Sequence, residues 1–247
     1  MKVLYFTATG NCLYVAKSFG GETYSIPTLL KKEEFTIEDD VIGIVFPVYN
    51  IGVPKLVEEF LDKAKLKAKY LFAIPTYGMY AGGVTRHLLE IGKRNNIQFS
   101  YINELVMVDN FLPGFEMKNQ VETLGKKNVE ENLNKINQDI KMKRLYLKKH
   151  SILVVPLKQM FSKLNHDDFE KNFYTEDSCN GCKTCEKVCP VNNITVDKKP
   201  VFNQNCQHCL ACIQNCPKKA IHHKKEKSSE RFRNEHISLK EIVNANE

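Results

Sequence analysis

Eight of the nine cysteines in this chain form a repeat near its C-terminal end. The segment CNGCKTCEKVCPVNNI (179–194) matches CQHCLACIQNCPKKAI (206–221) at every cysteine, at the proline and at the last isoleucine, with one constant offset. Each half therefore reads C-x2-C-x2-C-x3-C-P. A duplication of this kind predicts two structurally equivalent halves. Because so short a segment cannot hold itself together with a hydrophobic core, it needs ligands or cross-links as staples.

The spacing of these cysteines favours iron–sulfur clusters over zinc or a disulfide knot. Zinc sites use separate C-x-x-C pairs that close a tetrahedron, and a third ligand two residues later, followed by C-P, is a different pattern. In C-x2-C-x2-C-x3-C-P, the first three cysteines bind one 4Fe–4S cluster and the fourth binds the other. Over about residues 176–222 the chain resembles the bacterial two-cluster ferredoxins. The predicted ligand sets are Cys179, Cys182, Cys185 and Cys216 for one cluster, and Cys206, Cys209, Cys212 and Cys189 for its twin.

Residues 1 to about 110 alternate short strand-like runs with amphipathic helical patterns. Strands that alternate with helices of this length form βαβ units and predict a parallel, helix-covered sheet. Five strands are the number in the flavodoxin-like doubly wound order 2-1-3-4-5. The predicted fold class is therefore α/β, with a small α+β ferredoxin-like domain at the C-terminus. The strand-like runs are VLYF (3–6), TYSI (23–26), VIGIVFPV (41–48), YLFAIPTY (70–77) and QFSYINELVMV (98–108).

Changes in the pattern predict the domain boundaries. Residues 1–150 form the α/β domain, which ends in a long polar helical stretch (118–149) with an apolar stripe that packs on the sheet. Residues 151–175 lack a clear pattern and are the expected connector. Residues 176–222 form the cluster domain, and residues 223–247 form a tail. We expect the basic segments at 141–150 and 218–233 to be a solvated helix face and a solvated tail.

The loop TATGNC (7–12) lies between the first predicted strand and the first predicted helix. A glycine-bearing loop at this position places backbone N–H groups and the positive end of a helix where an anion can bind. Thr7, Thr9 and Asn11 add side-chain donors, and Gly10 allows a close backbone approach. The loop has no lysine or arginine, and Walker and G-x-G-x-x-G spacings are absent, which disfavours nucleoside triphosphates and dinucleotides. Helix capping by Thr9 or Asn11 explains the loop almost as well.

Two further loops follow buried strands at the carboxyl end of the predicted sheet, where doubly wound folds bind ligands. The loops FPVYNIGVP (46–54) and PTYGMYAGG (75–83) each place a tyrosine, Tyr49 or Tyr77, directly after a strand. A phosphate loop and two aromatic loops suit a planar ring with a phosphorylated tail. Packing of the two tyrosines at the edge of the core is the alternative interpretation.

These three loops resemble those of flavodoxin, because T-x-T-G-N is similar to that family's FMN-phosphate loop and the tyrosine loops match its two isoalloxazine-flanking loops. Together with the cluster domain, the chain resembles the EFR1-type ferredoxins, flavodoxin–ferredoxin fusions of anaerobic microbes, whose D-N-Y/F-L-P stretch looks like MVDNFLPGF (107–115). The resemblance implies bound FMN, although a turn or helix cap explains Asp109 and Asn110 equally well. With no tryptophan in the chain, Tyr49, Tyr77 or Tyr80 must stack on the ring. The expected cofactor-binding residues are Thr7, Thr9, Gly10, Asn11, Cys12, Pro47, Tyr49, Asn50, Thr76, Tyr77, Gly78, Asp109 and Asn110.

The combination predicts an electron-transfer protein that passes electrons between two 4Fe–4S clusters and FMN, and exchanges them with an external redox protein. Clusters pass single electrons whereas a flavin accepts one or two, so the pair can release electrons singly or together. No catalytic acid, base or nucleophile is predicted. One alternative is an FMN-dependent reductase of a small acceptor, such as a quinone, a nitro compound or oxygen, with its pocket at 49–53 and 80–84. Another is a redox-sensing or scaffold module that docks a partner on Lys141, Lys143, Arg144, Lys148 and Lys149.

Charge and hydropathy exclude other classes of partner. The formal net charge is +7, but two clusters of about −2 each and a flavin phosphate of about −2 would bring the loaded protein close to neutrality, so no nucleic-acid partner is expected. The longest apolar runs (41–48 and 151–157) are far shorter than the roughly 20 residues that span a bilayer. The first residues lack the order of a signal peptide, and we expect a cytoplasmic protein with no membrane span.

Overall fold

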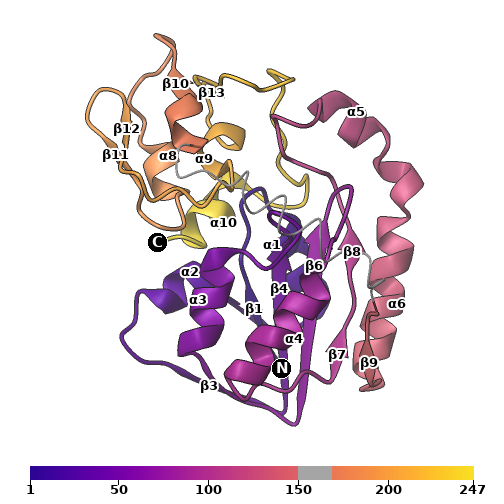
Figure 1. Ribbon diagram of the computed structural model, residues 1–247. Helices are drawn as coiled ribbons and strands as arrows, with labels where there is room; N and C mark the ends of the chain where they lie inside the picture. The colour runs from indigo at the N-terminus through magenta and orange to yellow at the C-terminus, as the bar shows by residue number, and fades with distance from the viewer. Residues whose placement is uncertain (150–168) are drawn as a thin grey trace.

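The computed structural model describes residues 1–149 and 169–247 of the chain. The first of these ranges is an α/β module built on one parallel sheet, and this sheet lies in the lower half of Figure 1. Its strand order is β2-β1-β4-β6-β7-β9, and β8 pairs with the end of β6. The strands are β1 (Lys2–Tyr5), β2 (Glu22–Ser25), β4 (Val41–Pro47), β6 (Tyr70–Tyr77), β7 (Tyr101–Ile102), β8 (Leu105–Val106) and β9 (Tyr146–Leu147).

The predicted doubly wound α/β class is confirmed, and the predicted order is met by the first four strands. The fifth predicted strand (98–108) is instead broken into β7 and β8. The Asn103 side-chain oxygen accepts the Glu104 N–H at 2.9 Å, and this local hydrogen bond competes with the sheet ladder. In addition β9 extends the sheet beyond β7, where a helix was expected.

Helices cover both faces of the sheet. On one face, α1 (Asn11–Ser18) contacts α6 (Val129–Lys141) through a hydrogen bond from the Tyr14 hydroxyl to Glu130. On the other face, which is in front in Figure 1, α3 (Lys55–Lys63) is tied to α4 (Val84–Arg94) by ion pairs of Arg94 with Glu58 and Asp62. The central strands β4 and β6 are buried along nearly their whole length, as their continuous apolar runs predict. The remaining elements of this module are α2 (Ile26–Leu30), the parallel pair β3 (Thr36–Glu38) and β5 (Lys65–Lys67), α5 (Met117–Glu122) and η1 (Leu124–Lys127).

The long helix predicted over 118–149 is wrong in its extent. It is interrupted at Asn128, which has a left-handed backbone (φ 47°), a conformation that asparagine tolerates better than most residues. It ends at Lys141, and Lys143 is again left-handed (φ 52°). The apolar stripe packs on the sheet along α6, whereas Val121 is half exposed.

Residues 169–247 form a second module, which lies over the carboxyl ends of the strands (Figure 1). Part of the expected connector belongs to it, because residues 173–175 pair antiparallel with residues 221–223. The rest of that connector, 151–168, lies outside the described residues. The elements are η3 (Phe169–Asn172), the antiparallel pair β10 (Phe173–Thr175) and β13 (Ile221–His223), the antiparallel pair β11 (Ile194–Val196) and β12 (Pro200–Phe202), and the helices α8 (Thr184–Lys187), α9 (Ala211–Gln214) and α10 (Leu239–Asn244).

The last residues of the expected tail (223–247) pack on the α/β module, whereas the lysines of the basic segment 218–233 are exposed. Ile237 and Ile242 are buried in the main core, and the Ser25 hydroxyl donates to the Ala245 carbonyl. A capping box between Ser238 and Glu241 starts α10. Within the described ranges, no helix is both long enough and apolar enough to cross a membrane.

Candidate functional site

A cavity of about 840 Å³ lies where the strand-end loops of the α/β module face the C-terminal module. Of the thirteen residues predicted to bind the phosphorylated cofactor, twelve line this cavity and only Gly10 does not. The predicted phosphate loop and both tyrosine loops therefore meet at one place. The C-terminal module contributes the lining residues Phe169, Asn172, His208, Leu210, His223 and Lys225.

The loop at 7–12 is buried and its helix end has no side-chain cap. Helix α1 begins at Asn11 behind Gly10, whose backbone is left-handed (φ 96°), and no side chain makes a cap hydrogen bond there. The alternative interpretation, capping by Thr9 or Asn11, is therefore not what the structure shows. The Thr7 hydroxyl oxygen accepts the Gly10 N–H at 3.0 Å and the Thr9 hydroxyl oxygen accepts from Asn110 Nδ2 at 2.7 Å. Both hydroxyl protons are left to donate toward an anion at the start of α1.

The first tyrosine loop is a two-residue turn. Tyr49 and Gly52 exchange both backbone hydrogen bonds, and Asn50 and Ile51 between them are both left-handed (φ 50° and 56°). A left-handed backbone is costly for a β-branched residue such as Ile51, and strain of this kind is concentrated at functional sites. Ile51 packs against Gly82 of the second tyrosine loop, where an added Cβ would lie 2.4 Å from the Ile51 Cβ.

The hydroxyl of Tyr49 is buried and has no hydrogen-bond partner. Burial raises the pKa of Tyr49 far above its ordinary value, and the nearby thiols of Cys209, Cys12 and Cys206 raise it further. The group is therefore a protonated donor at neutral pH. A buried donor without a partner in a cavity indicates a site for a ligand that accepts a hydrogen bond.

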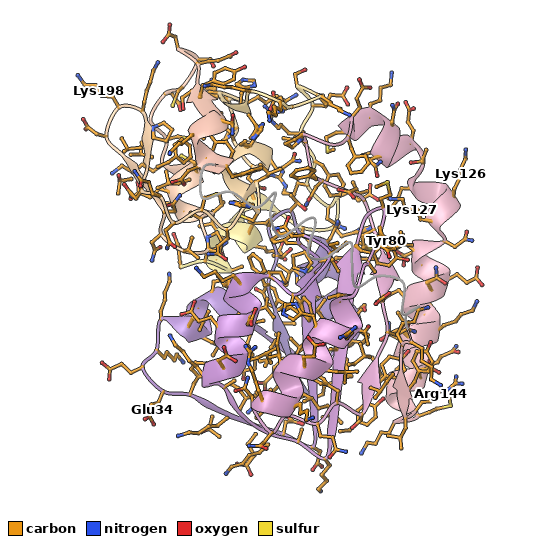
Figure 2. The ribbon with its side chains drawn as sticks, in the orientation of Figure 1. Glu34, Tyr80, Lys126, Lys127, Arg144 and Lys198 are labelled. Carbon is orange, nitrogen blue, oxygen red and sulfur yellow. The ribbon has the colours of Figure 1, made fainter. Side chains whose placement is uncertain are left out.

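Asp109 ties two of the loops together. Its carboxylate accepts the Met79 N–H and the Phe111 N–H, each at 3.1 Å, and burial raises its pKa. A side chain at Gly78 would collide with it, since an added Cβ would lie 2.1 Å from the Asp109 Cβ. Lys127 donates to the Met107 carbonyl at 2.6 Å from the other side. Figure 2 shows Tyr80 and Lys127 at the end of the α/β module that faces the second module.

Seven of the eight repeat cysteines can be assigned to two groups. Burial raises the pKa of Cys185 to about 12, and the nearby thiols of Cys216 and Cys182 contribute to this increase. In the other group, burial and then the thiols of Cys206 and Cys189 raise the pKa of Cys209. The structure thus brings Cys182, Cys185 and Cys216 together, and Cys189, Cys206, Cys209 and Cys212 together.

The two halves of the repeat have matching backbone conformations. The Asn193 N–H donates to Cys189 Sγ at 3.2 Å, and the Ala220 N–H donates to Cys216 Sγ at 3.3 Å in the other half. Hydrogen bonds to ligand sulfurs are one of the factors that set the potential of a cluster. Left-handed residues recur at equivalent positions, in the pairs Gly181 and His208, Lys183 and Leu210, and Asn192 and Lys219.

The geometry also bears on zinc, the alternative to clusters. Zinc requires its ligands around one point, each sulfur at about 2.3 Å from the ion. Across residues 1–149 and 169–247, no three histidine, cysteine or carboxylate side chains converge in a way that could hold a single metal ion.

The second cysteine group lies beside the cavity, and the first lies toward solvent. His208 and Leu210, which alternate with the cysteines of the 206–212 loop, line the cavity. Cys209 and Cys212 are buried, whereas Cys182 of the first group is exposed. Lys198 projects from the hairpin of β11 and β12 on the outer side of this module (Figure 2).

Fold and cysteine pattern together define the class: an α/β doubly wound module joined to an iron–sulfur domain of the two-cluster ferredoxin type, a kind of domain that suggests electron transfer. Residues 178–220, which include all eight repeat cysteines, match the family model of the 4Fe-4S dicluster domain. The predicted iron–sulfur domain is thereby confirmed.

Two known proteins are similar to this chain over very different lengths. An uncharacterized protein of Methanocaldococcus jannaschii is 26% identical over 204 residues, which are 77% of this chain and 91% of that protein. A protein of Methanosarcina acetivorans, named as one subunit of an ion-translocating oxidoreductase complex, is 44% identical over 48 residues, only 19% of this chain and 18% of that protein. The first similarity extends well beyond the cluster domain, whereas the second is a short segment.

Several residues around the cavity were not singled out by the sequence analysis. Lys127 holds the loops at 78 and 107, and Gln214 of the C-terminal module contacts the loop at 107–111. Asn215 of the same module and Asn234 of the last segment (232–247) contact the loop at 7–12. No periodicity or motif marks these side chains. The one available signal was the S-L-K-E capping box at 238–241, which indicates a helix in the supposed tail.

Proposed function

We propose that this chain is an electron-transfer protein that binds FMN in the cavity and two 4Fe–4S clusters in the C-terminal module, and exchanges electrons with an external redox protein. The observation that carries the proposal is that one cavity is lined jointly by the phosphate loop, both tyrosine loops and the second cysteine loop. Two redox sites that share a wall need no diffusional encounter to exchange electrons.

The cluster ligands are the two sets predicted from the spacing. Cys179, Cys182, Cys185 and Cys216 hold the first cluster, and Cys206, Cys209, Cys212 and Cys189 hold the second. The grouping of the thiols supports this assignment. Burial disfavours the thiolates of Cys209 and Cys212 in the absence of a positive partner, and iron provides one when bound.

The residues around the cavity fit FMN. Thr7 and Thr9, with the uncapped start of α1, provide neutral donors for a phosphate. The turn at Tyr49 and the loop from Tyr77 to Tyr80 provide two walls for a planar ring, and the Tyr49 hydroxyl provides a donor to its edge. When bound, FMN would supply a centre that takes up one or two electrons.

The positions of the two cysteine groups give a path for the electrons. Cys182 is the exposed member of the first group, so an external partner reaches this side of the module. His208 and Leu210 of the second cysteine loop line the cavity, and Cys212 of the second group is close enough to Cys185 of the first for that thiol to raise its pKa. The proposed order is therefore external partner, first cluster, second cluster and FMN, in either direction. The short match to a protein named for an oxidoreductase complex supports a redox partner.

One observation favours a second candidate function, an FMN-dependent reductase of a small acceptor. The cavity extends past the predicted cofactor loops to Phe111, Phe115, Phe169 and His223. His223 Nδ1 accepts the Lys225 N–H at 3.0 Å, and burial lowers its pKa, so the neutral ring carries its proton on Nε2. That Nε2 is buried without a hydrogen-bond partner, and it could donate to the oxygen of a quinone or nitro compound.

The test of the proposal is a cofactor inventory of protein purified without air. We expect about eight irons and eight sulfides, with one FMN, per chain. Thr7→Val, which keeps the side-chain shape, should lose FMN and keep the iron. Iron without flavin in the wild-type protein would overturn the FMN half of the proposal.

A second measurement separates the two candidate functions. A carrier should be reduced and reoxidised by protein partners but turn over slowly with a quinone. A reductase should reduce the quinone catalytically, and His223→Phe should raise its KM while iron and FMN content stay unchanged.

A further inference from the structure

Two side chains of the C-terminal module reach into the loops of the predicted phosphate site. Gln214 and Asn215 end helix α9 and are buried, with 4% and 3% exposure. Asn215 Nδ2 donates to the Ala8 carbonyl, and Gln214 Nε2 donates to the Asn110 carbonyl, at 2.9 Å and 2.8 Å. One contact therefore holds the loop at 7–12, and the other holds the loop at 107–111.

These two residues lie between cysteines of different groups. Cys212 precedes them and belongs to the second ligand set, whereas Cys216 follows them and belongs to the first. Asn215 Nδ2 also donates to the Ala211 carbonyl at 2.9 Å, so its orientation depends on the helical turn of α9. A short turn of this kind is not stable by itself, and its geometry depends on the ligands at both ends.

The last segment of the chain (residues 232–247) also contacts the loop at 7–12. The Asn234 N–H donates to the Thr9 carbonyl at 2.8 Å, and Asn234 Nδ2 donates to Asn11 Oδ1 at 3.2 Å. The segment is held to α9 in turn, because Gln214 Oε1 accepts the Phe232 N–H at 2.7 Å. Gln214 thus connects the cysteine repeat, the loop at 107–111 and the last segment.

These contacts determine how the loop presents its donors. A peptide unit is planar and trans, so fixing the Ala8 carbonyl on one side directs the Thr9 N–H to the opposite side. Fixing the Thr9 carbonyl does the same for the Gly10 N–H, which the Thr7 hydroxyl then accepts. Without the Asn215 side chain, the buried Ala8 carbonyl loses this partner, and without the backbone N–H of residue 234, the buried Thr9 carbonyl loses its own. The loop would then rearrange to satisfy them.

We propose that Gln214, Asn215 and Asn234 are positioning residues of the phosphate site, so that the site takes its binding form only when the cysteine module is folded around its clusters. This inference rests on the proposed function. FMN affinity and cluster occupancy are then linked, and the linkage is reciprocal. Loss of the clusters weakens FMN binding by about 5- to 150-fold, and bound FMN protects the clusters from a chelator by the same factor at equilibrium.

The experiment compares Asn215→Ala with a matched control, Asn193→Ala. Both asparagines are 3% exposed and lie in the cysteine repeat, but the Asn193 side chain bonds to Glu170 and Asn205 within its own module. The dissociation constant of FMN is measured without air from the quenching of flavin fluorescence, together with iron and sulfide per chain. We expect Asn215→Ala to raise the dissociation constant of FMN at least about fivefold, while the iron content of this variant stays complete. The Asn193→Ala control should have the wild-type dissociation constant for FMN if its iron content is complete, and should bind FMN as weakly as cluster-free protein if it is not.

Gln214→Ala should behave like Asn215→Ala. Asn234→Ala should weaken FMN binding less, because alanine keeps the N–H that the Thr9 carbonyl accepts and only the side-chain bond to Asn11 is lost. FMN binding is also measured on wild-type protein stripped of iron by a chelator, because this comparison does not depend on the folding of any variant. Equal FMN affinity of stripped and loaded wild-type protein, or wild-type affinity in all three variants, overturns the inference and leaves the proposed function intact. A wild-type protein that has its clusters and binds no FMN contradicts the proposed function itself.

Discussion

Two glycines flank helix α1, and they show how differently one residue type can be constrained. Gly10 and Gly20 both have a left-handed backbone, with φ of 96° and 72°. A Cβ added at Gly10 would lie 2.9 Å from the Ile237 Cβ, whereas one added at Gly20 would meet nothing within 4 Å. Gly20 is therefore fixed by its backbone alone, and Gly10 also by the segment that covers it.

This difference predicts unequal effects of alanine at the two positions. Gly20→Ala should cost about 1–2 kcal/mol for the left-handed backbone, and Gly10→Ala should cost about 1–3 kcal/mol more because Ile237 must shift. The thermal midpoint, which moves by about 2–4 °C per kcal/mol in a chain of this size, measures both. Equal midpoints for the two variants would show that the last segment does not press on Gly10.

Tyr49 gives a second prediction at a single residue. Because its hydroxyl has no partner, Tyr49→Phe should leave the thermal midpoint of the FMN-free protein unchanged or raise it slightly. If the hydroxyl donates to FMN, the same change should weaken FMN binding about two- to tenfold, and equally from pH 6 to 8, because the raised pKa keeps the hydroxyl protonated. Tyr146→Phe, at an exposed side chain that does not line the cavity, serves as control. An unchanged dissociation constant for Tyr49→Phe would remove this hydroxyl from the site.

At the scale of elements, the central strands could be predicted because buried parallel strands are continuously apolar, as β4 and β6 are. Failures of prediction have local causes. The strand at 98–108 is broken by the side chain of Asn103, and the helix at 118–149 is broken by the left-handed Asn128. Neither residue disturbs the hydrophobic period, so the pattern alone gives no sign of the break.

Helix α10 gives a prediction about pH. Hydrogen bonds from Lys17 and then Ser238 lower the pKa of Glu241 to about 2. Its unfolded value is about 4.3, so the charged carboxylate stabilises the folded chain above that pH, and this contribution is lost as the pH falls toward 2. Glu241→Gln should lower the thermal midpoint at pH 7, and its difference from wild type should shrink below about pH 4. Glu235→Gln, at an exposed side chain, should show no such difference; a constant gap for Glu241→Gln at all pH values would contradict the assignment.

For the whole molecule, the sequence could predict what is local and repeated. The cysteine spacing predicts the cluster domain, and loops at the carboxyl ends of parallel strands must meet, so most of the cavity lining could be named in advance. The contact of Asn215 with Ala8 joins residues 207 positions apart, and no period or motif encodes it. It depends on how two modules pack, which a sequence pattern does not specify.

The arrangement of charges around the first cysteine group predicts how a partner docks. Cys182 is exposed, Lys218 is close enough to favour its thiolate, and Lys183 and Lys219 are exposed nearby in the sequence. An acidic one-electron donor protein should therefore reduce the loaded protein more slowly as salt rises. Replacing Lys218 and Lys219 by glutamate should lower the second-order rate constant at low salt about tenfold, with unchanged iron content.

The matched control for that experiment carries glutamate at Lys141 and Lys143, on the α/β module. These two lysines belong to the basic segment that the scaffold hypothesis invokes. Equal loss of rate in both double variants would show a general charge effect rather than docking at the first cysteine group. Loss of rate in the control alone would move the docking surface to the α/β module.

The contact between Asn234 and the loop at 7–12 has a consequence for biosynthesis. The strands of the α/β module are made first and can pair while the chain is still growing. The Thr9 carbonyl receives its partner only after residue 234 has left the ribosome, by which time the whole cysteine repeat has also emerged. The loop at 7–12 is thus completed only after residue 234 has emerged, and growing chains that have not reached this residue should not take up FMN.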